Sequence, residues 1–127
     1  MAEGLSSYAA NATLNAMGNN TSFAVAQAYV QLHTAAPGAA GTSNVATETT
    51  RKAVSFAAAS AGAIASDADI SWTNIAGSQD ATHFTVWDAS SAGNFLFSGT
   101  ITANGYTAGD TYTFPSGAFT ASFTLAS

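Results

Sequence analysis

The two histidines of this chain are its first candidates for metal binding or catalysis. His33 and His83 each lie in a stretch that alternates with the period of a β-strand. Two imidazoles and a carboxylate make a common metal site, but neither histidine has a second candidate ligand two or four residues further on. Nothing in the sequence fixes the two near each other, so we expect both to be structural or to face solvent.

The aspartates are candidates for calcium binding or for acid–base catalysis. Asp67 and Asp69 lie on the same side of an extended chain, but calcium needs about six to eight oxygens and the EF-hand pattern is absent. Asp80, Asp88 and Asp110 lie in turn-like sequence, where Asp commonly bonds its own backbone. We therefore expect these carboxylates to cap turns.

Common catalytic motifs are absent from the sequence. No serine lies in a G-x-S-x-G pattern, and no glycine run matches a phosphate-binding loop. There is also no cysteine to act as a nucleophile, a zinc ligand or a disulfide partner. We therefore predict that the chain is not an enzyme and has no catalytic, cofactor-binding or metal-binding residue.

The cations and the large aromatic residues are candidates for binding a partner. Arg51 and Lys52 are the only basic residues, and they indicate either a docking contact to an acidic partner or a solvated strand end opposite Glu48. The aromatic residues indicate either a platform for a sugar or anchors in the core or at an interface. They are Tyr29, Trp72 and Trp87.

Charge excludes two classes of partner. The 127 residues include two basic and seven acidic ones, which gives a net charge of −5. Two cations cannot neutralise the several phosphates on which nucleic-acid binding depends, and they offer little to an anionic membrane. No apolar run approaches the roughly 20 residues that cross a bilayer, and we see no signal peptide. We predict no nucleic-acid partner and no membrane.

The elements that must position these residues have few large side chains to fold around. Ala, Thr, Ser and Gly make up 73 residues, whereas Leu, Ile, Val and Phe make up 22, eight of them Phe. The length is that of one domain. A low net charge and several aromatic residues argue against disorder, so we expect the chain to fold around its phenylalanines.

The N-terminal segment is the one helical candidate. Apolar residues recur at spacings of three and four over residues 4–17, and Gly18 follows as a possible cap. The helix has too few large residues to bury much by itself, so we expect residues 1–22 to form a docking arm with its linker. The candidate interface residues of this arm are Leu5, Tyr8, Leu14 and Met17.

From residue 23 onward the apolar pattern has the period of two that is typical of strands. About seven strands are predicted, around residues 28–33, 54–56, 70–72, 83–87, 95–101, 112–114 and 119–125. In the last, we expect Phe119, Ala121, Phe123 and Leu125 to point inward. Residues 23–127 are therefore predicted to form a small antiparallel, jelly-roll-like β-sandwich, so that the whole chain is all-β with a short N-terminal α-helix.

Residues 34–50 form the longest segment without a clear period. A loop of this length in a compact domain is usually functional or an extended arm. Two interpretations are open, an arm for contact with another molecule and a mobile surface loop. If it is an arm, Pro37 in its Pro-Gly turn joins the candidate interface residues, together with Arg51 and Lys52 that follow the loop.

Five blocks of sequence resemble a known family. They are YVQLHTAAPG at 29–38, RKAVSFAAA at 51–59, ISWT at 70–73, THFTVWDA at 82–89 and GNFLFSG at 93–99. Their order is similar to that in small tailed-bacteriophage virion proteins, often labelled tail-fibre-like or minor tail proteins, which in some phages coat the capsid. One departure is Ala36, where the family often has Asp before the Pro-Gly turn.

The resemblance implies a structural component that is made in the bacterial cytoplasm and assembled onto the virion surface. Fibres usually carry shaft repeats or a long helix, and this chain has neither. We therefore predict first a capsid decoration protein that contacts the major capsid protein and copies of itself. A minor tail or tail-fibre protein in contact with tail proteins is the alternative, and a carbohydrate-binding module for host attachment is a further one.

Overall fold

The computed structural model describes residues 3–126, and at positions 103 and 104 only the backbone. One helix and eight strands lie in this range, which confirms the predicted mostly-β class with a short N-terminal helix. The elements are α1 (Ser7–Gly18), β1 (Ala28–His33), β2 (Lys52–Val54), β3 (Ala63–Ala65), β4 (Ile70–Trp72), β5 (Gln79–Trp87), β6 (Phe95–Tyr106), β7 (Tyr112–Phe114) and β8 (Thr120–Ser122).

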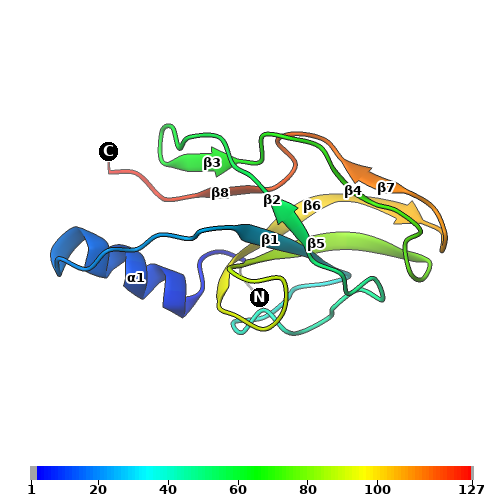
Figure 1. The fold of residues 1–127 in the computed structure, drawn as a ribbon, viewed down its shortest axis with the longest axis horizontal. Helices are drawn as coiled ribbons and strands as arrows, with labels where there is room; N and C mark the ends of the chain where they lie inside the picture. The colour runs from blue at the N-terminus through cyan, green and yellow to red at the C-terminus, as the bar shows by residue number, and fades with distance from the viewer. Residues whose placement is uncertain (1–2, 127) are drawn as a thin grey trace.

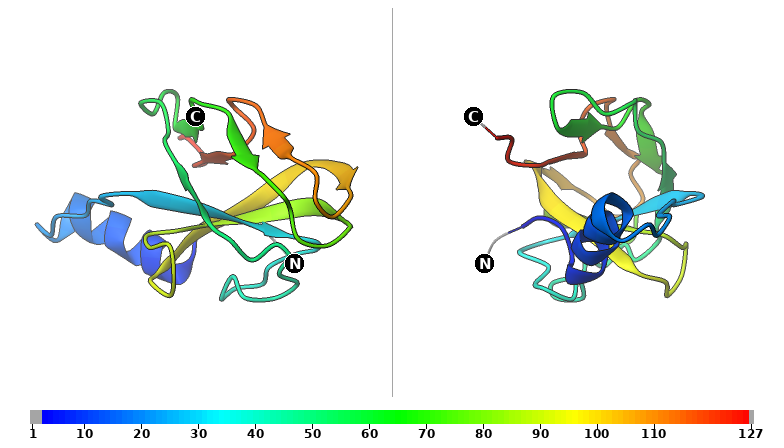
Figure 2. Two further views of the ribbon diagram at one scale, coloured as in Figure 1. Left: turned by 45° about the vertical axis from the view of Figure 1, so that its right-hand side comes forward. Right: turned by 90° about the vertical axis from the view of Figure 1, so that its left-hand side faces the viewer.

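The strands form two layers (Figures 1 and 2). One layer is a four-stranded antiparallel sheet in the order β2-β1-β5-β6. The other consists of two short antiparallel pairs, β3 with β8 and β4 with β7, which lie over one face of the larger sheet. The arrangement is that of a small β-sandwich with one incomplete layer.

Aromatic rings fill the space between the layers. Phe84 of β5 contacts Phe119 with 5.0 Å between ring centroids, and Phe119 contacts Phe114 of β7 at the same distance. Trp72 of β4 lies edge-on to Phe114 at 5.7 Å. A Cβ at Gly99 would lie 2.7 Å from the Phe84 ring, so glycine on β6 makes the room that this ring occupies. Such aromatic pairs contribute about 0.5–1.5 kcal/mol each beyond their buried area.

The other face of the four-stranded sheet is covered by residues 34–50, which run beneath it in Figure 1. The amide of Ala46 donates to the carbonyl of Leu32 at 3.1 Å, and Ala46 is buried. A Cβ at Gly41 would lie 2.8 Å from the Phe95 ring, which shows how closely the segment packs on β6. Part of its backbone and its few buried side chains therefore belong to the domain. Contact of this segment with another molecule stays a prediction, as does its mobility.

The prediction for the last strand is wrong beyond residue 122. Phe119 is fully buried, but Phe123 and Leu125 are 53% and 57% exposed. The reason is the length of the partner strand β3, which has only three residues and begins directly after the tight turn of Ala61 and Gly62. The chain therefore runs past the end of its sheet after the amide of Phe123 has bonded the carbonyl of Gly62.

We predict that Phe119→Ala lowers the free energy of unfolding by about 3–5 kcal/mol, because it leaves a cavity in the centre of the aromatic core. Phe123→Ala is the matched control and changes it by less than about 1 kcal/mol, since that ring is already half exposed. Urea unfolding of both variants measures the difference. Equal losses would contradict the assignment of the two rings.

Candidate interaction surface

Helix α1 is held to the sheet at its N-terminal end. Residues 4–6 run along the edge strand β6, where the amide of Ser98 donates to the carbonyl of Gly4 and that of Ser6 to the carbonyl of Leu96. The Ser6 hydroxyl oxygen then accepts from the amide of Ala9 at 3.0 Å and caps the helix. The helix thus begins at Ser7 and not at residue 4, because residues 4–6 are used as a strand.

Beyond its first turn the helix leaves the domain (Figure 1). Ala9 is its one buried residue among those described, whereas Leu14 and Met17 are 60% and 74% exposed. Tyr8 turns to the opposite side and packs edge-on against Phe23 at 6.2 Å. No residue of α1 carries a charge. The helix therefore presents an apolar, uncharged stripe that its own domain does not cover.

The stripe forms one wall of a groove of about 460 Å³, and the C-terminal segment forms the other. Leu5 lies between the walls and also borders an adjoining hollow lined by Ile64 and Phe97. We call this surface the α1 groove. Its lining residues are Leu5, Ala10, Thr13, Leu14, Met17, Phe123 and Thr124.

The structure thus brings together three of the predicted interface residues, Leu5, Leu14 and Met17, and adds one that sequence reasoning missed. Phe123 was assigned to the core because the alternation of its strand continues to the C-terminus. The short pairing partner, three residues in β3, is the signal that would have placed it outside.

The candidate interface residues Pro37, Arg51 and Lys52 lie apart from the groove. The Pro37 side chain is fully buried in the packed 34–50 segment, so it presents no surface for a partner. Lys52 is half-buried on the edge strand β2. These three positions lie in a different part of the fold from α1. The predicted set of interface residues therefore combines residues of separate surfaces.

Arg51 is engaged within the chain. Its guanidinium lies 4.1 Å from the centroid of the Trp87 ring, and Nη1 donates to the carbonyls of Ala89 and Ala92 at 2.9 and 2.7 Å. Cation–π stacking and two carbonyl acceptors use most of what a guanidinium offers. Arg51 therefore ties the β5–β6 turn to the sheet, and its contact with an acidic partner stays a prediction.

The aromatic sugar platform predicted as one alternative is wrong for both tryptophans. Trp72 is 1% exposed and donates its indole N–H to the carbonyl of Thr50, while Trp87 is 7% exposed beneath Arg51. A stacked sugar needs an open ring face. In a chain with few large side chains, these rings are used as core.

The two histidines are direct cross-strand neighbours on β1 and β5, although nothing in the sequence indicated this. His33 is fully buried, with Nδ1 2.8 Å from the carbonyl of Ser43 and Nε2 2.9 Å from the hydroxyl of Thr85. The carbonyl can only accept, so we assign the proton to Nδ1. The Thr85 hydroxyl then donates to Nε2 and itself accepts from the indole N–H of Trp87 at 2.7 Å.

This arrangement keeps His33 neutral. Burial is the main cause that lowers its pKa, and the neighbouring His83 acts in the same direction. His83 is partly exposed, with Nε2 3.9 Å from the Glu3 carboxylate. Among residues 3–126 no three His, Asp or Glu side chains converge as a metal site would require.

The carboxylates bond backbone amides at turns. Asp88 accepts from the amide of Asn94, Asp69 from that of Ser116 and Asp110 from that of Thr107, at 2.7, 2.9 and 3.3 Å. The bonds of Asp88 and Asp110 confirm the turn-capping prediction for these two aspartates, whereas Asp69 bonds a turn that lies 47 residues further along the chain.

Glu48 is buried and joins two loops. Its carboxylate accepts from the amides of Ala76 and Thr50 at 3.0 and 3.2 Å. Burial alone would raise the pKa of Glu48, but these bonds outweigh it and lower the pKa. The carboxylate therefore holds the 34–50 segment against the loop that follows β4, and it is not free for acid–base chemistry.

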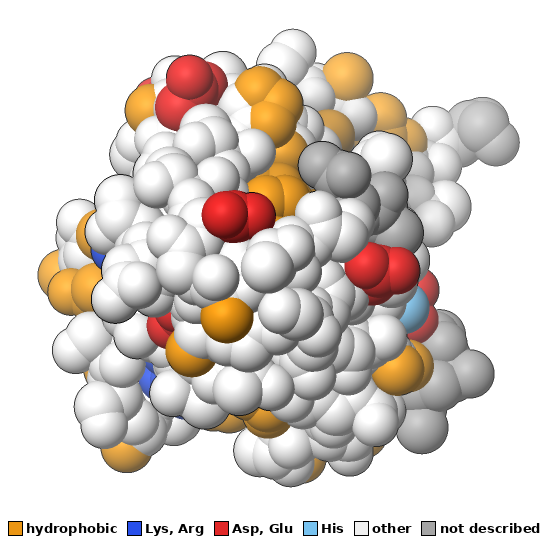
Figure 3. Space-filling view, turned by 90° about the vertical axis from the view of Figure 1, so that its right-hand side faces the viewer, with side chains coloured by type: hydrophobic (Ala, Val, Ile, Leu, Met, Phe, Trp, Pro, Cys, Tyr) orange, Lys and Arg blue, Asp and Glu red, His pale blue; other side chains and the backbone are white. Residues whose placement is uncertain are grey.

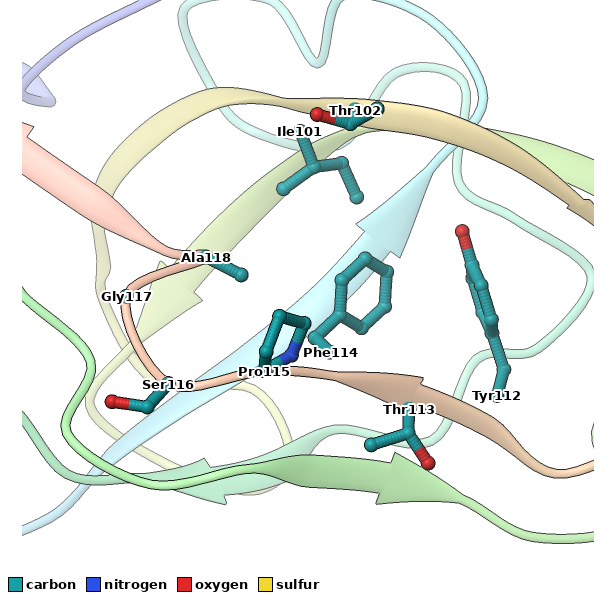
Figure 4. A pocket seen from close by; sticks show the side chains of 9 residues that line it. All are labelled: Ile101, Thr102, Tyr112, Thr113, Phe114, Pro115, Ser116, Gly117 and Ala118. Carbon is teal, nitrogen blue, oxygen red and sulfur yellow. The ribbon is translucent and has the colours of Figure 1, made fainter.

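A second hollow, of about 510 Å³, lies between β6 and β7. Ile101 and Phe114 face each other across it, whereas the hydroxyls of Thr113 and Ser116 turn away (Figure 4). These hydroxyls bond Ser71 at 2.8 Å and the carbonyl of Ser66 at 3.3 Å. The hollow thus offers apolar contact with few directed polar groups.

The end of the molecule opposite α1 differs in character. Uncharged polar side chains and backbone dominate it, with acidic groups scattered between them (Figure 3). The apolar, charge-free surface of the α1 groove lies at the other end.

A family model described as podophage GP4 fiber I protein gp80 matches residues 4–122, which include α1 and all eight strands described. The chain belongs to this family. The match confirms the resemblance to small tailed-phage virion proteins and makes this gp80 family member a structural component of a phage virion.

A search of curated proteins finds no match to the gp80 family member. In residues 3–126 no helix is long and apolar enough to cross a membrane. The predicted division into an arm at 1–22 and a domain at 23–127 stays a prediction, and its residues 1, 2 and 127 lie outside the described part.

We predict that stability rises with pH up to about 6.5 through His33. Its pKa is lowered in the folded state, so between that pKa and the unfolded value near 6.5 the unfolded chain binds more protons. Stability is therefore full above about pH 6.5 and falls as the pH drops below it. Urea unfolding as a function of pH measures this slope.

The two histidines provide their own control for this prediction. His33→Gln removes the slope near pH 6, whereas His83→Gln reduces it only in part, because burial is the larger cause of the lowered His33 pKa and His83 the smaller one. A slope that survives His33→Gln would contradict the assignment.

Proposed function

We propose that this chain is a component of the tail fibre of a podophage and that it works by packing against other virion proteins, without catalysis. The observation that carries the proposal is the fiber-family match over residues 4–122. It outweighs the lack of shaft repeats, which favoured the capsid in the sequence alone, because a small β domain can be one part of a fibre built from several chains.

The α1 groove supports a role in assembly. A permanent component of a particle needs contacts that stay formed in changing salt. Apolar contacts meet this need because salt does not screen them as it screens charge–charge contacts. No charged side chain lines the groove. Burying its apolar surface would contribute roughly 25 cal/mol per Å² before the cost of ordering the partners.

The polar residues support a non-catalytic role. Three chemically capable buried or half-buried groups, His33, Arg51 and Glu48, are each held by partners within the chain. A catalytic group needs a free lone pair or proton beside a place for substrate. We propose that these residues maintain a rigid domain whose function lies on its surface.

The proposed partners are other tail proteins and copies of this chain, after synthesis in the bacterial cytoplasm. The decoration role, with the major capsid protein as partner, stays a prediction that the same experiment tests. With Trp72 and Trp87 buried, we propose no sugar-binding function.

Gold-conjugated antibodies against this chain, applied to intact particles, test the proposal. We expect label on the tail, at the fibres, and none on particles made without the gene for this chain. Dense label on the head would replace the fibre role with decoration. Absence of label from both would overturn the structural role on the virion surface altogether.

A further inference from the structure

The α1 groove, together with Leu125 beside the adjoining hollow, exposes an apolar patch as large as the largest on a typical small monomer, and such patches are often functional. Large side chains have roughly 150–250 Å² of surface each, so the exposed fractions at this end leave on the order of 500 Å² uncovered. The exposed residues are Leu5 (38%), Leu14 (60%), Met17 (74%), Phe123 (53%) and Leu125 (57%). Contiguous patches beyond a few hundred Å² mark interaction sites on soluble proteins.

Charge restricts what can cover this surface. Neither α1 nor residues 120–126 contain a charged residue, so a charged partner segment would lose its hydration there without gaining an opposite charge. Glu3, two residues before Leu5, is directed at His83. The groove therefore fits an uncharged apolar segment, preferably a helix that lays one stripe between two walls.

The chain itself carries such a segment. On α1, Ala10, Leu14 and Met17 follow the spacing of four and three that keeps them on one helix face. We propose that the α1 groove of one copy receives α1 of a second copy, and that the second groove receives the first helix. This pairing deepens the proposed function and rests on it, since it names a partner for the surface assigned there to assembly.

A two-fold pair satisfies the constraints of area and shape together. In such an interface each copy offers the same patch, here both stripe and groove. Two copies cover on the order of 1,000 Å², which is about what a stable interface needs. Beyond its first turn, α1 projects past the end of the sheets (Figures 1 and 2). This projection gives a second helix a length of α1 along which it can lie.

Light scattering coupled to size exclusion, on the whole purified chain over a range of concentrations, tests the pairing. We expect a mass of twice 12.7 kDa for the wild type. The double variant Leu14→Lys with Met17→Lys should run at the monomer mass, because lysine keeps the helix but places charge in the interface.

The control has the same change in charge at the opposite end of the molecule. Ala108→Lys with Thr111→Lys modifies exposed positions between β6 and β7, and it should keep the double mass. Circular dichroism checks that both variants retain the wild-type secondary structure and unfold cooperatively, so that a lower mass reports loss of association and not unfolding.

Two results would overturn the pairing, namely a wild-type chain that is monomeric at every concentration and an assembly whose mass the Leu14 and Met17 lysines do not change. The first result together with gold label on the tail would leave the fibre role intact. A lysine-sensitive pair without any label on particles would support the pairing and reject the fibre role.

Discussion

The contact between Phe84, Phe119 and Phe114 holds the two layers of the molecule together. Phe84 comes from β5 of the large sheet, Phe114 from β7 of the layer above it, and Phe119 from the residue before β8. β3, β4, β7 and β8 have three residues each, which is too few for their hydrogen bonds alone to hold them. The rings therefore provide much of the contact that positions the upper layer, beside the Trp72 bond to Thr50 and the Glu48 bond to Ala76.

The small number of large apolar side chains makes the exposed ones informative. A chain with so few large apolar side chains fills one small core with them and covers the other face of the sheet with the 34–50 segment, yet it leaves Leu14, Met17 and Phe123 in solvent. In the free monomer these residues contribute little to folding and favour aggregation. Their gathering at one end, on walls without charge, is the physical basis for assigning that end to assembly.

The sequence was sufficient where local pattern determines structure. Alternation placed Val30 and Leu32 of β1 and Phe84 and Val86 of β5 on one buried face, as observed. It failed where a partner element decides the outcome.

The failures share that cause. Phe123 continues the alternation but has no strand beside it. The 34–50 segment has no period because the sheet that it packs against decides which of its residues are buried. The pairing of His33 with His83 depends on the register of β1 and β5, which are 50 positions apart. The α1 groove was half predictable for the same reason, since its helix wall is local and its C-terminal wall is set by the length of β3.

We propose that other subunits cover α1 and the C-terminal segment in the assembled virion. A cryo-electron microscopy reconstruction of the assembled particle tests this most directly. We predict density from another subunit against Leu14, Met17 and Phe123, with the mostly uncharged polar opposite end facing outward. A reconstruction in which α1 stands in solvent while the opposite end makes the contacts would contradict the account.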